Sequence, residues 1–272
     1  MDPQKKHRLS NASFVILLVF ILWGLIGLIF WPIKVTSFWG VGLGVIAEIF
    51  FIAVLYGREF GIKKGILSLL AIFILIIGAA LLNQFRGWPY GFLTYHDILG
   101  WKILGVAWPI PLFWSFLTAS ALILMRPRTI SHDPKVLFSW AFDTAFSVMI
   151  LSLIVEPILT SSTAQVWSMT SYFSGVPLNS FIGWFVSSFV AAAAAILIGK
   201  LWLVEDRPKP INLFVVTIGL ILLGIMAAQR LVLVPVIGLC VIALVFLLVL
   251  LYVQYKPQIK KDGSSVAAGD QG

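Results

Sequence analysis

Three carboxylic acids lie within or at the end of long apolar segments of the chain, where a charged side chain is costly. They are Glu48, Asp143 and Glu156. A carboxylate inside a membrane span normally turns inward, pairs or takes up a proton, and it is a functional candidate by default. In a water-poor site such an acid can keep its proton at neutral pH and act as a proton donor. The structural alternatives are a helix cap or a hydrogen bond across the bundle, and Glu156 precedes Pro157, a pattern that also marks a helix end.

The segment Gly87–Gly100 concentrates polar and aromatic chemistry between two apolar runs. Its sequence, GWPYGFLTYHDILG, contains three glycines, four aromatic residues and the adjacent ionisable pair His96 and Asp97. A second connection, Glu156–Pro177, is rich in Ser, Thr and aromatic residues and has no Lys or Arg. An interfacial aromatic belt and a solvated His96-Asp97 pair are the plain structural interpretations. Gly87–Gly100 nevertheless carries far more chemistry than a link between two helices requires, which makes it a candidate binding segment.

The elements that must position these residues are membrane helices. Of the 272 residues, 60% are hydrophobic and 11% are charged, whereas a soluble domain carries roughly 25% charged residues. Runs of about 20 apolar residues can cross a bilayer as helices, which satisfy their own backbone hydrogen bonds. We therefore predict an all-α integral membrane bundle of about eight spans in one domain, residues 1–252, followed by a disordered cytoplasmic tail, residues 253–272. The predicted spans are Ala12–Trp31, Phe38–Tyr56, Gly65–Leu82, Leu104–Met125, Val136–Val155, Leu178–Leu203, Ile211–Ala228 and Leu231–Tyr252.

Lysine and arginine are distributed unevenly over the connections. If successive segments alternate between two sides, fifteen of the 19 fall on the side of both termini, and only Lys34, Arg86, Lys102 and Arg230 fall on the other. The positive-inside rule then places both termini in the cytoplasm and the two long connections together on the opposite face. We expect a multi-pass protein of a bacterial or archaeal cell membrane. The net charge of +8 fits a cytoplasmic collar over anionic lipid, so no nucleic-acid partner is expected.

Several kinds of membrane enzyme need residues that the sequence lacks. The three histidines, His7, His96 and His132, are too few and too scattered for a di-iron desaturase. There is no DxxD pair to hold a magnesium diphosphate, and there is no Walker loop, dinucleotide fingerprint or nucleophile elbow. The single cysteine, Cys240, cannot form an intramolecular disulfide or a thiolate metal cluster. An enzyme with this sequence is therefore expected to work without a metal or a redox cofactor.

The middle of the chain, residues 83–185, resembles the carotenoid biosynthesis membrane protein family. That family includes the CruF-type carotenoid 1,2-hydratases and bisanhydrobacterioruberin hydratase. The resemblance rests on GWPYGFLTYHDILGWKILGVAWPIPLFW from Gly87 to Trp114, on Glu156-Pro157 and Trp167, and on GVPLNSFIGWF from Gly175 to Phe185. The chain departs from the family pattern in three places: Asn83-Gln84 replaces a Glu, Glu156 replaces an Asp before the proline, and Ser152 replaces another Asp. These departures leave the identity of the acid open.

The resemblance implies a hydro-lyase that adds water to the terminal 1,2 double bond of an acyclic carotenoid. The reaction needs an acid, a setting that tolerates a tertiary carbocation, and a water whose proton a second group removes. We expect Glu156 and Asp97 to be the acid/base pair, with His96 and Tyr95 in support and Asp143 as the deeper alternative acid. Aromatic faces stabilise cations such as the carbocation of this reaction. An asparagine or a further acid can hold the water by hydrogen bonds. The expected substrate-binding residues are Glu48, Trp88, Tyr90, Trp108, Trp167 and Asn179.

A non-catalytic carotenoid or lipid carrier, or a small-solute transporter, is the competing hypothesis. Counted along the predicted spans, Glu48 and Asp143 are at similar distances from the cytoplasmic ends, so they could share one depth and form a proton relay. The expected partners of the hydratase are an acyclic carotenoid, water and the lipid bilayer.

Overall fold

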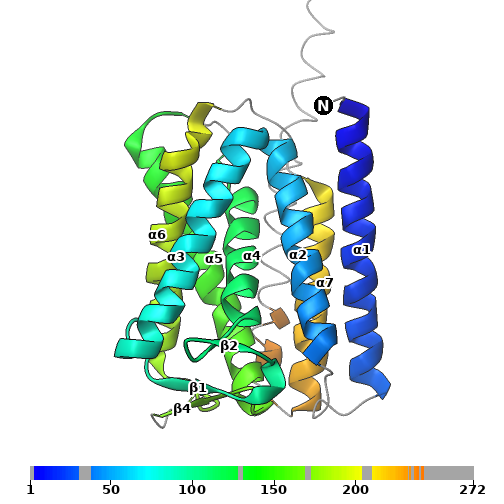
Figure 1. Ribbon diagram of the computed structural model, residues 1–272, viewed down its shortest axis with the longest axis vertical. Helices are drawn as coiled ribbons and strands as arrows, with labels where there is room; N and C mark the ends of the chain where they lie inside the picture. Colours follow the sequence, from blue (N-terminus) through cyan, green and yellow to red (C-terminus); the bar gives the residue numbers. More distant parts are fainter. Residues whose placement is uncertain are drawn as a thin grey trace, which may run out of the picture.

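In the part of the chain that the computed structural model describes, seven long α-helices run up and down in a single bundle (Figure 1). The structure describes residues 3–30, 38–127, 131–168, 173–203, 210–231, 233, 236–238 and 240–241. Among these residues, four short strands and two 3-10 turns lie in the connections. The helices are α1 Pro3–Phe30, α2 Phe38–Glu59, α3 Ile62–Arg86, α4 Pro109–Leu124, α5 Pro134–Ser161, α6 Leu178–Gly199 and α7 Ile211–Arg230. The strands are β1 Leu93–Tyr95, β2 Lys102–Ile103, β3 Val106–Ala107 and β4 Gln165–Trp167, and the 3-10 turns are η2 Asp97–Leu99 and η3 Leu201–Leu203.

The predicted all-α membrane bundle is confirmed. Within the described residues, α3, α5 and α6 are long and apolar enough to cross a membrane, and shorter apolar helical stretches occur at Asn11–Gly24, Pro109–Leu124 and Val215–Ala227. The fourth helix begins five residues later than predicted, because the residues before Pro109 form a hairpin instead of helix. The predicted eighth span lies mostly, and the predicted tail wholly, outside the described residues.

Local signals define several helix ends. Asp133 caps α5 by accepting a hydrogen bond from the Lys135 backbone N–H at 2.9 Å, and Pro134 occupies the first helical position, where its missing N–H is not needed. At the end of α3, Gly87 adopts the left-handed conformation and donates its N–H to the Asn83 carbonyl at 2.7 Å. This is the usual glycine stop of a helix, and it turns the chain into the segment that precedes β1.

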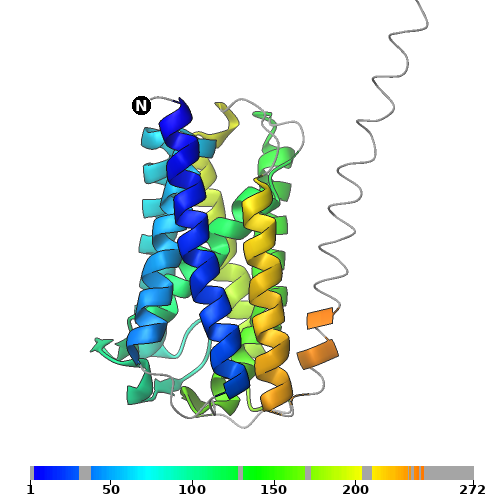
Figure 2. The ribbon, with the colours of Figure 1, turned by 90° about the vertical axis from the view of Figure 1, so that its right-hand side faces the viewer.

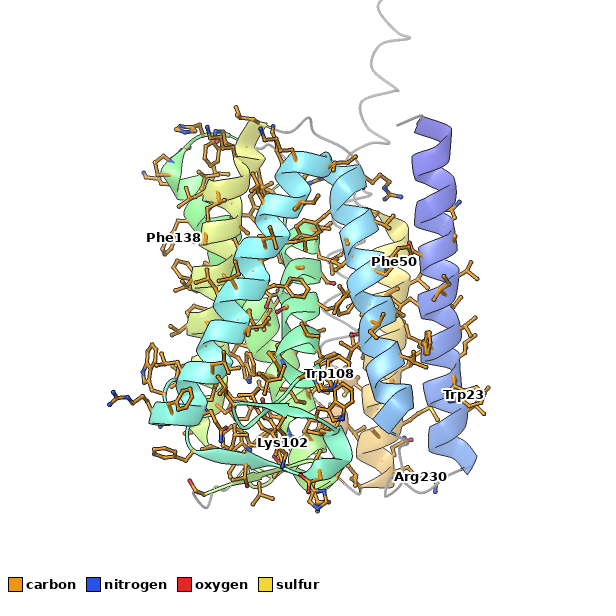
Figure 3. The ribbon with its side chains drawn as sticks, in the orientation of Figure 1. Trp23, Phe50, Lys102, Trp108, Phe138 and Arg230 are labelled. Carbon is orange, nitrogen blue, oxygen red and sulfur yellow. The ribbon has the colours of Figure 1, made fainter. Side chains whose placement is uncertain are left out.

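Close packing holds the bundle together, and its outer surface is apolar. Helix α3 packs along α6, where Ser68 Oγ donates to the Ala195 carbonyl at 3.0 Å. Figure 2 shows α1 between α2 and α7. The side chains of Trp23, Phe50 and Phe138 are exposed on different helices and point away from the bundle (Figure 3). Such a surface suits lipid, whereas a soluble monomer rarely exposes apolar patches of this extent.

The two long connections lie together at one end of the bundle, opposite the end at which α1 begins (Figure 1). Lys102 and Arg230 lie at the end with these connections (Figure 3), as does Arg86 at the end of α3. Lys64 lies at the other end, where α3 begins. The predicted alternation of the helices is therefore confirmed, and three of the four positive residues assigned to the minority side share that end. The fourth, Lys34, lies outside the described residues.

Candidate functional site

The two long connections form one structure. Strand β1 pairs antiparallel with β4, so that Leu93 is opposite Trp167 and Tyr95 is opposite Gln165. The backbone N–H of His96 extends the pairing by donating to the Ala164 carbonyl at 2.9 Å. The expectation that both connections lie on one face is confirmed, and the pairing brings residues some 70 positions apart in the sequence into one site.

Glu156 lies beneath this small sheet and is 2% exposed. Trp184 Nε1–H of α6 donates to its Oε1 at 2.6 Å, and the Gln165 side-chain amide of β4 donates to its Oε2. Helix α5 continues through Pro157 to Ser161, so the Glu-Pro pair does not end the helix. A buried carboxylate with a donor on each oxygen is held in a fixed position. These contacts make Glu156 the centre of the candidate site.

A stack of three aromatic rings fixes the donor Trp184. The Tyr90 ring stacks on Trp184 with 4.2 Å between ring centroids and an interplanar angle of 29°. The Trp114 ring also stacks on Trp184, with 3.9 Å between centroids and an angle of 19°. The Tyr90 hydroxyl donates to Ser187 Oγ at 2.9 Å. Stacking and hydrogen bonding together leave Trp184 little freedom, so its N–H stays directed at Glu156.

Asn83 anchors the segment that carries Tyr90. Its Nδ2 donates to the Gly91 carbonyl at 2.9 Å, and its Oδ1 accepts from the Tyr90 backbone N–H at 2.8 Å. Both bonds are buried, and a side-chain amide is suited to this position because it both donates and accepts. An ionised carboxylate could only accept. The amide at Asn83, one of the departures from the family pattern, therefore has a structural role in this chain.

We expect Asn83→Asp to lower the stability of the protein. The Gly91 carbonyl would lose its donor inside the protein, and leaving a buried polar group unsatisfied costs roughly 1–3 kcal/mol. Thermal unfolding of the detergent-purified protein measures the effect. Asn179→Asp is the matched control, because the Asn179 side chain is exposed. Equal melting temperatures of the two variants would contradict the anchoring role.

Tyr95 and Tyr90 remain protonated in this environment. Burial raises the pKa of the Tyr95 phenol, and the nearby Glu156 and Tyr90 raise it further. Burial also raises the pKa of the Tyr90 phenol, partly offset by its bond to Ser187 and reinforced by Glu156. Both phenols therefore keep their proton over the whole physiological pH range, and the Tyr90 O–H is donated to Ser187.

The structure does not bring Asp97 and Glu156 together. The Asp97 side chain is 90% exposed and pairs with Lys102 Nζ at 2.6 Å. The Lys102 ammonium, by hydrogen bond and by charge, lowers the pKa of Asp97, and the neighbouring His96 lowers it slightly further. His96 is also exposed. An ionised, solvent-facing carboxylate is poorly placed to exchange protons with a group in the interior.

The two other acids also lie apart. Asp143 is exposed on α5, within 3.3 Å of Ser139 Oγ. Glu48 is buried on α2, and its Oε2 has no hydrogen-bond partner in the described part of the chain. One faces outward and the other inward, so the pair does not form the shared relay that the transporter hypothesis requires.

The predicted aromatic residues have different positions. Trp167 is buried and donates through Nε1 to Thr160 Oγ1 at 3.1 Å, and Thr160 Oγ1 also lies 3.3 Å from the Gln165 amide. Trp88 is exposed, and Trp108 lines a separate apolar cavity. We call the residues around the buried acid the Glu156 cluster: Tyr90, Tyr95, Trp114, Glu156, Gln165, Trp167 and Trp184. The predictions included Glu156, Tyr90, Tyr95 and Trp167 but missed Gln165, Trp184 and Trp114. Trp184 lies within the GVPLNSFIGWF motif, and that signal could have identified it.

A comparison with protein-family models finds one match over most of the chain. The family model described as "Carotenoid biosynthesis protein" matches residues 39–250. The matched range includes every residue of the Glu156 cluster. No curated protein and no solved structure matches the chain.

Proposed function

Because the chain belongs to the carotenoid biosynthesis protein family, we propose that it is a membrane hydratase that adds water across the terminal 1,2 double bond of an acyclic carotenoid. The observation that supports this proposal best is the buried Glu156, held by Trp184 and Gln165 beneath the paired connections. A single positioned acid is the minimum that such a reaction needs.

The proposed reaction proceeds in two steps. The Glu156 carboxyl gives its proton to C2 of the end group, which becomes CH2, and the electron pair of the double bond forms the new C–H bond. The cation left at C1 is tertiary. The oxygen of a water then forms a bond to C1, and the carboxylate of Glu156 takes the proton that this water loses. Atoms and charge balance, and Glu156 returns to its initial state without a second carboxylate.

Gln165 can form a hydrogen bond with Glu156 in both protonation states of the acid. A side-chain amide carries a donor and an acceptor, and a half-turn about its last bond exchanges the two. With its N–H turned to Glu156, as found here, it favours the carboxylate. With its carbonyl turned to Glu156, it accepts a bond from the protonated acid. We therefore assign Gln165 as a positioning residue, and Tyr95, a protonated phenol close to Glu156, as the donor that orients the water.

The test is expression of the chain in a bacterial host that accumulates an acyclic carotenoid, followed by liquid chromatography and mass spectrometry of the pigments. A hydratase gives a more polar product, heavier by one water, with an unchanged visible spectrum because the conjugated chain is untouched. Well-expressed protein that produces no such compound from short or long acyclic substrates would contradict the proposal.

We expect Asp97→Asn to retain at least about half of the wild-type hydration. The exposed Asp97–Lys102 ion pair is of the kind that contributes little to a folded protein, and within the described residues neither member bonds to Glu156. The product-to-substrate ratio in the expression host measures the effect, normalised to the amount of protein. A loss as large as that of a Glu156 variant would instead support Asp97 as the second member of the acid/base pair.

A carotenoid carrier is the alternative that one observation favours, namely an apolar cavity whose described lining residues include no carboxylate. A carrier would bind pigment and leave its mass unchanged, so the same pigment analysis separates the two functions.

We further propose a multi-pass location in a bacterial or archaeal cell membrane with both termini cytoplasmic, supported by the uneven distribution of Lys and Arg between the two ends of the bundle. Reporter fusions at either terminus test this orientation.

A further inference from the structure

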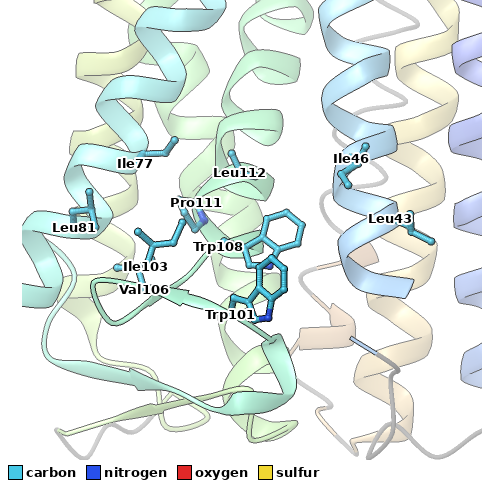
Figure 4. Close-up of a pocket in the computed structure, with 10 residues that line it drawn as sticks. All are labelled: Leu43, Ile46, Ile77, Leu81, Trp101, Ile103, Val106, Trp108, Pro111 and Leu112. Atoms are coloured by element: carbon cyan, nitrogen blue, oxygen red, sulfur yellow. The ribbon is translucent and has the colours of Figure 1, made fainter. Parts of the chain in front are cut away.

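A cavity of about 530 Å³ lies between α2 and α3, beside the start of α4. Figure 4 shows its lining: side chains of α2, such as Ile46, face those of α3, such as Ile77, and Trp101 and Trp108 lie between them. Every lining residue is Leu, Ile, Val, Pro or Trp. The volume falls within the range of small-molecule sites, roughly 300–1,000 Å³, but the described part of the wall offers no carboxylate, ammonium, amide or hydroxyl side chain to a polar ligand.

One wall of the cavity is a hairpin of defined geometry. Ile103 of β2 is opposite Val106 of β3, and both line the cavity. The two residues between them, Leu104 and Gly105, have φ values of 51° and 85°, as tight two-residue hairpin turns require. Leucine rarely adopts this conformation. Retaining such a turn at an apolar residue is a feature that often accompanies a binding site.

The hairpin is also fitted closely against α3. A Cβ atom added to Gly105 would lie 2.9 Å from Gln84 Nε2, so only a glycine permits this approach without displacing the Gln84 side chain. The hairpin wall is thereby held beside α3 and at the N-terminal end of α4. The cavity is consequently a shaped feature of this end of the bundle, bounded on several sides by described residues.

We propose that this cavity holds part of the conjugated chain of the acyclic carotenoid substrate, an inference that rests on the proposed function. The lining favours a hydrocarbon occupant, because among the described lining side chains only the indole N–H groups of Trp101 and Trp108 could bond to a buried polar group. Trp101 and Trp108 offer flat faces on which a flat, rigid polyene can stack. A flexible lipid acyl chain would lose more conformational freedom in the same space, which favours the polyene over the bilayer's own lipids.

Helix α4 connects the cavity to the candidate site. Pro111 and Leu112 line the cavity, while Trp114, less than one turn further along, stacks on the Trp184 that donates to Glu156. Both features lie at the end of the bundle that carries the paired connections (Figures 1 and 4). A long substrate bound in the cavity could therefore extend its end group along α4 toward Glu156, which would make the cavity residues determinants of chain specificity.

The test measures pigment that co-purifies with the protein, in the Glu156→Gln background so that bound substrate is not converted. In that background Ile77→Trp fills the cavity, and Ile74→Trp is the matched control, because Ile74 is exposed on the same helix and does not line the cavity. Ile46→Trp repeats the filling from α2 at a half-exposed position, which guards against misfolding of one variant. Pigment per protein is read from absorbance after detergent purification, and bound phospholipid is measured in the same samples.

We expect Ile77→Trp and Ile46→Trp to carry at least about tenfold less acyclic carotenoid than Ile74→Trp, because an extra indole overfills the cavity. Equal pigment in all three variants, no pigment in any of them, or a selective loss of phospholipid would overturn the inference. The result is independent of the proposed reaction. If the wild type forms no hydrated product and cavity filling still removes pigment, then hydration fails and the binding site stands.

Discussion

Replacing Glu156 by glutamine is expected to reduce carotenoid hydration by at least about 100-fold, the lower part of the range for a positioned general acid. The substitution preserves shape, and the new side chain can still accept the Trp184 N–H, while Gln165 can turn its carbonyl toward the new amide. The fold should therefore persist although no proton remains to be transferred. The product-to-substrate ratio in the expression host, with protein quantified in the membrane fraction, measures the effect.

Asp143→Asn is the matched control for this experiment. It also neutralises an acid of α5, but that acid is exposed and lies apart from the cluster, so near-normal hydration is expected. If Glu156→Gln converts carotenoid at the wild-type rate while Asp143→Asn does not, the acid has been assigned to the wrong residue.

The second large effect is expected from Gly183→Ala. A Cβ atom at this position of α6 would lie 2.5 Å from Tyr90 Cδ1 and 2.8 Å from the Pro89 carbonyl oxygen. The ring and the backbone that carry the aromatic stack would have to move away from α6, and overpacking of this kind costs roughly 1–3 kcal/mol. We expect a lower melting temperature together with a loss of hydration, because Trp184 then loses its stacking on Tyr90 beside Glu156.

Gly78→Ala serves as the comparison for Gly183→Ala. A Cβ atom at Gly78 of α3 meets nothing within 4 Å, and alanine is favoured over glycine in a helix by up to about 1 kcal/mol. This variant should be as stable as the wild type or slightly more so, and fully active. If both variants behave alike, the close approach at Gly183 does not support the site.

The helices could be predicted from the sequence because their signal is local. Long apolar runs bounded by charges and glycines gave seven spans whose described counterparts differ only at their ends. The β2–β3 hairpin was missed for a physical reason: its turn places the apolar Leu104 in a conformation usually taken by Gly or Asn, so the segment resembles the start of a helix. The pairing of Ile103 with Val106 and the close approach of Gly105 to Gln84 distinguish it in the structure.

The candidate site could be predicted only in part because it depends on contacts between distant segments. Glu156 and Tyr95 were identified by residue type and motif, but the roles of Gln165 and Trp184 follow from strand pairing and helix packing. Which face of a helix is buried is equally a tertiary property. Asp143 was expected to face inward and is exposed, since its helix presents that side to the outside of the bundle.

Counting Lys and Arg predicted the end of the bundle on which a residue lies but not whether its side chain is exposed. Arg126 contributed to the predicted cytoplasmic collar, where an exposed side chain is expected. In the structure it is buried, with its guanidinium 3.6 Å from Glu59, a carboxylate that also pairs with Arg58. The count correctly identified the end of the bundle on which Arg126 lies, but a count cannot separate a surface charge from a buried ion pair that ties α2 to α4.

The most direct test of the central claim is the source of the new oxygen in the product. The expression host is supplied with water enriched in heavy oxygen while it accumulates an acyclic carotenoid, and the pigments are analysed by mass spectrometry for the wild type and for Glu156→Gln. Hydration at Glu156 predicts a product heavier than the substrate by one labelled water in the wild type and its near absence in the variant. An unlabelled hydroxyl in the product, or a labelled product from both proteins, would contradict the account.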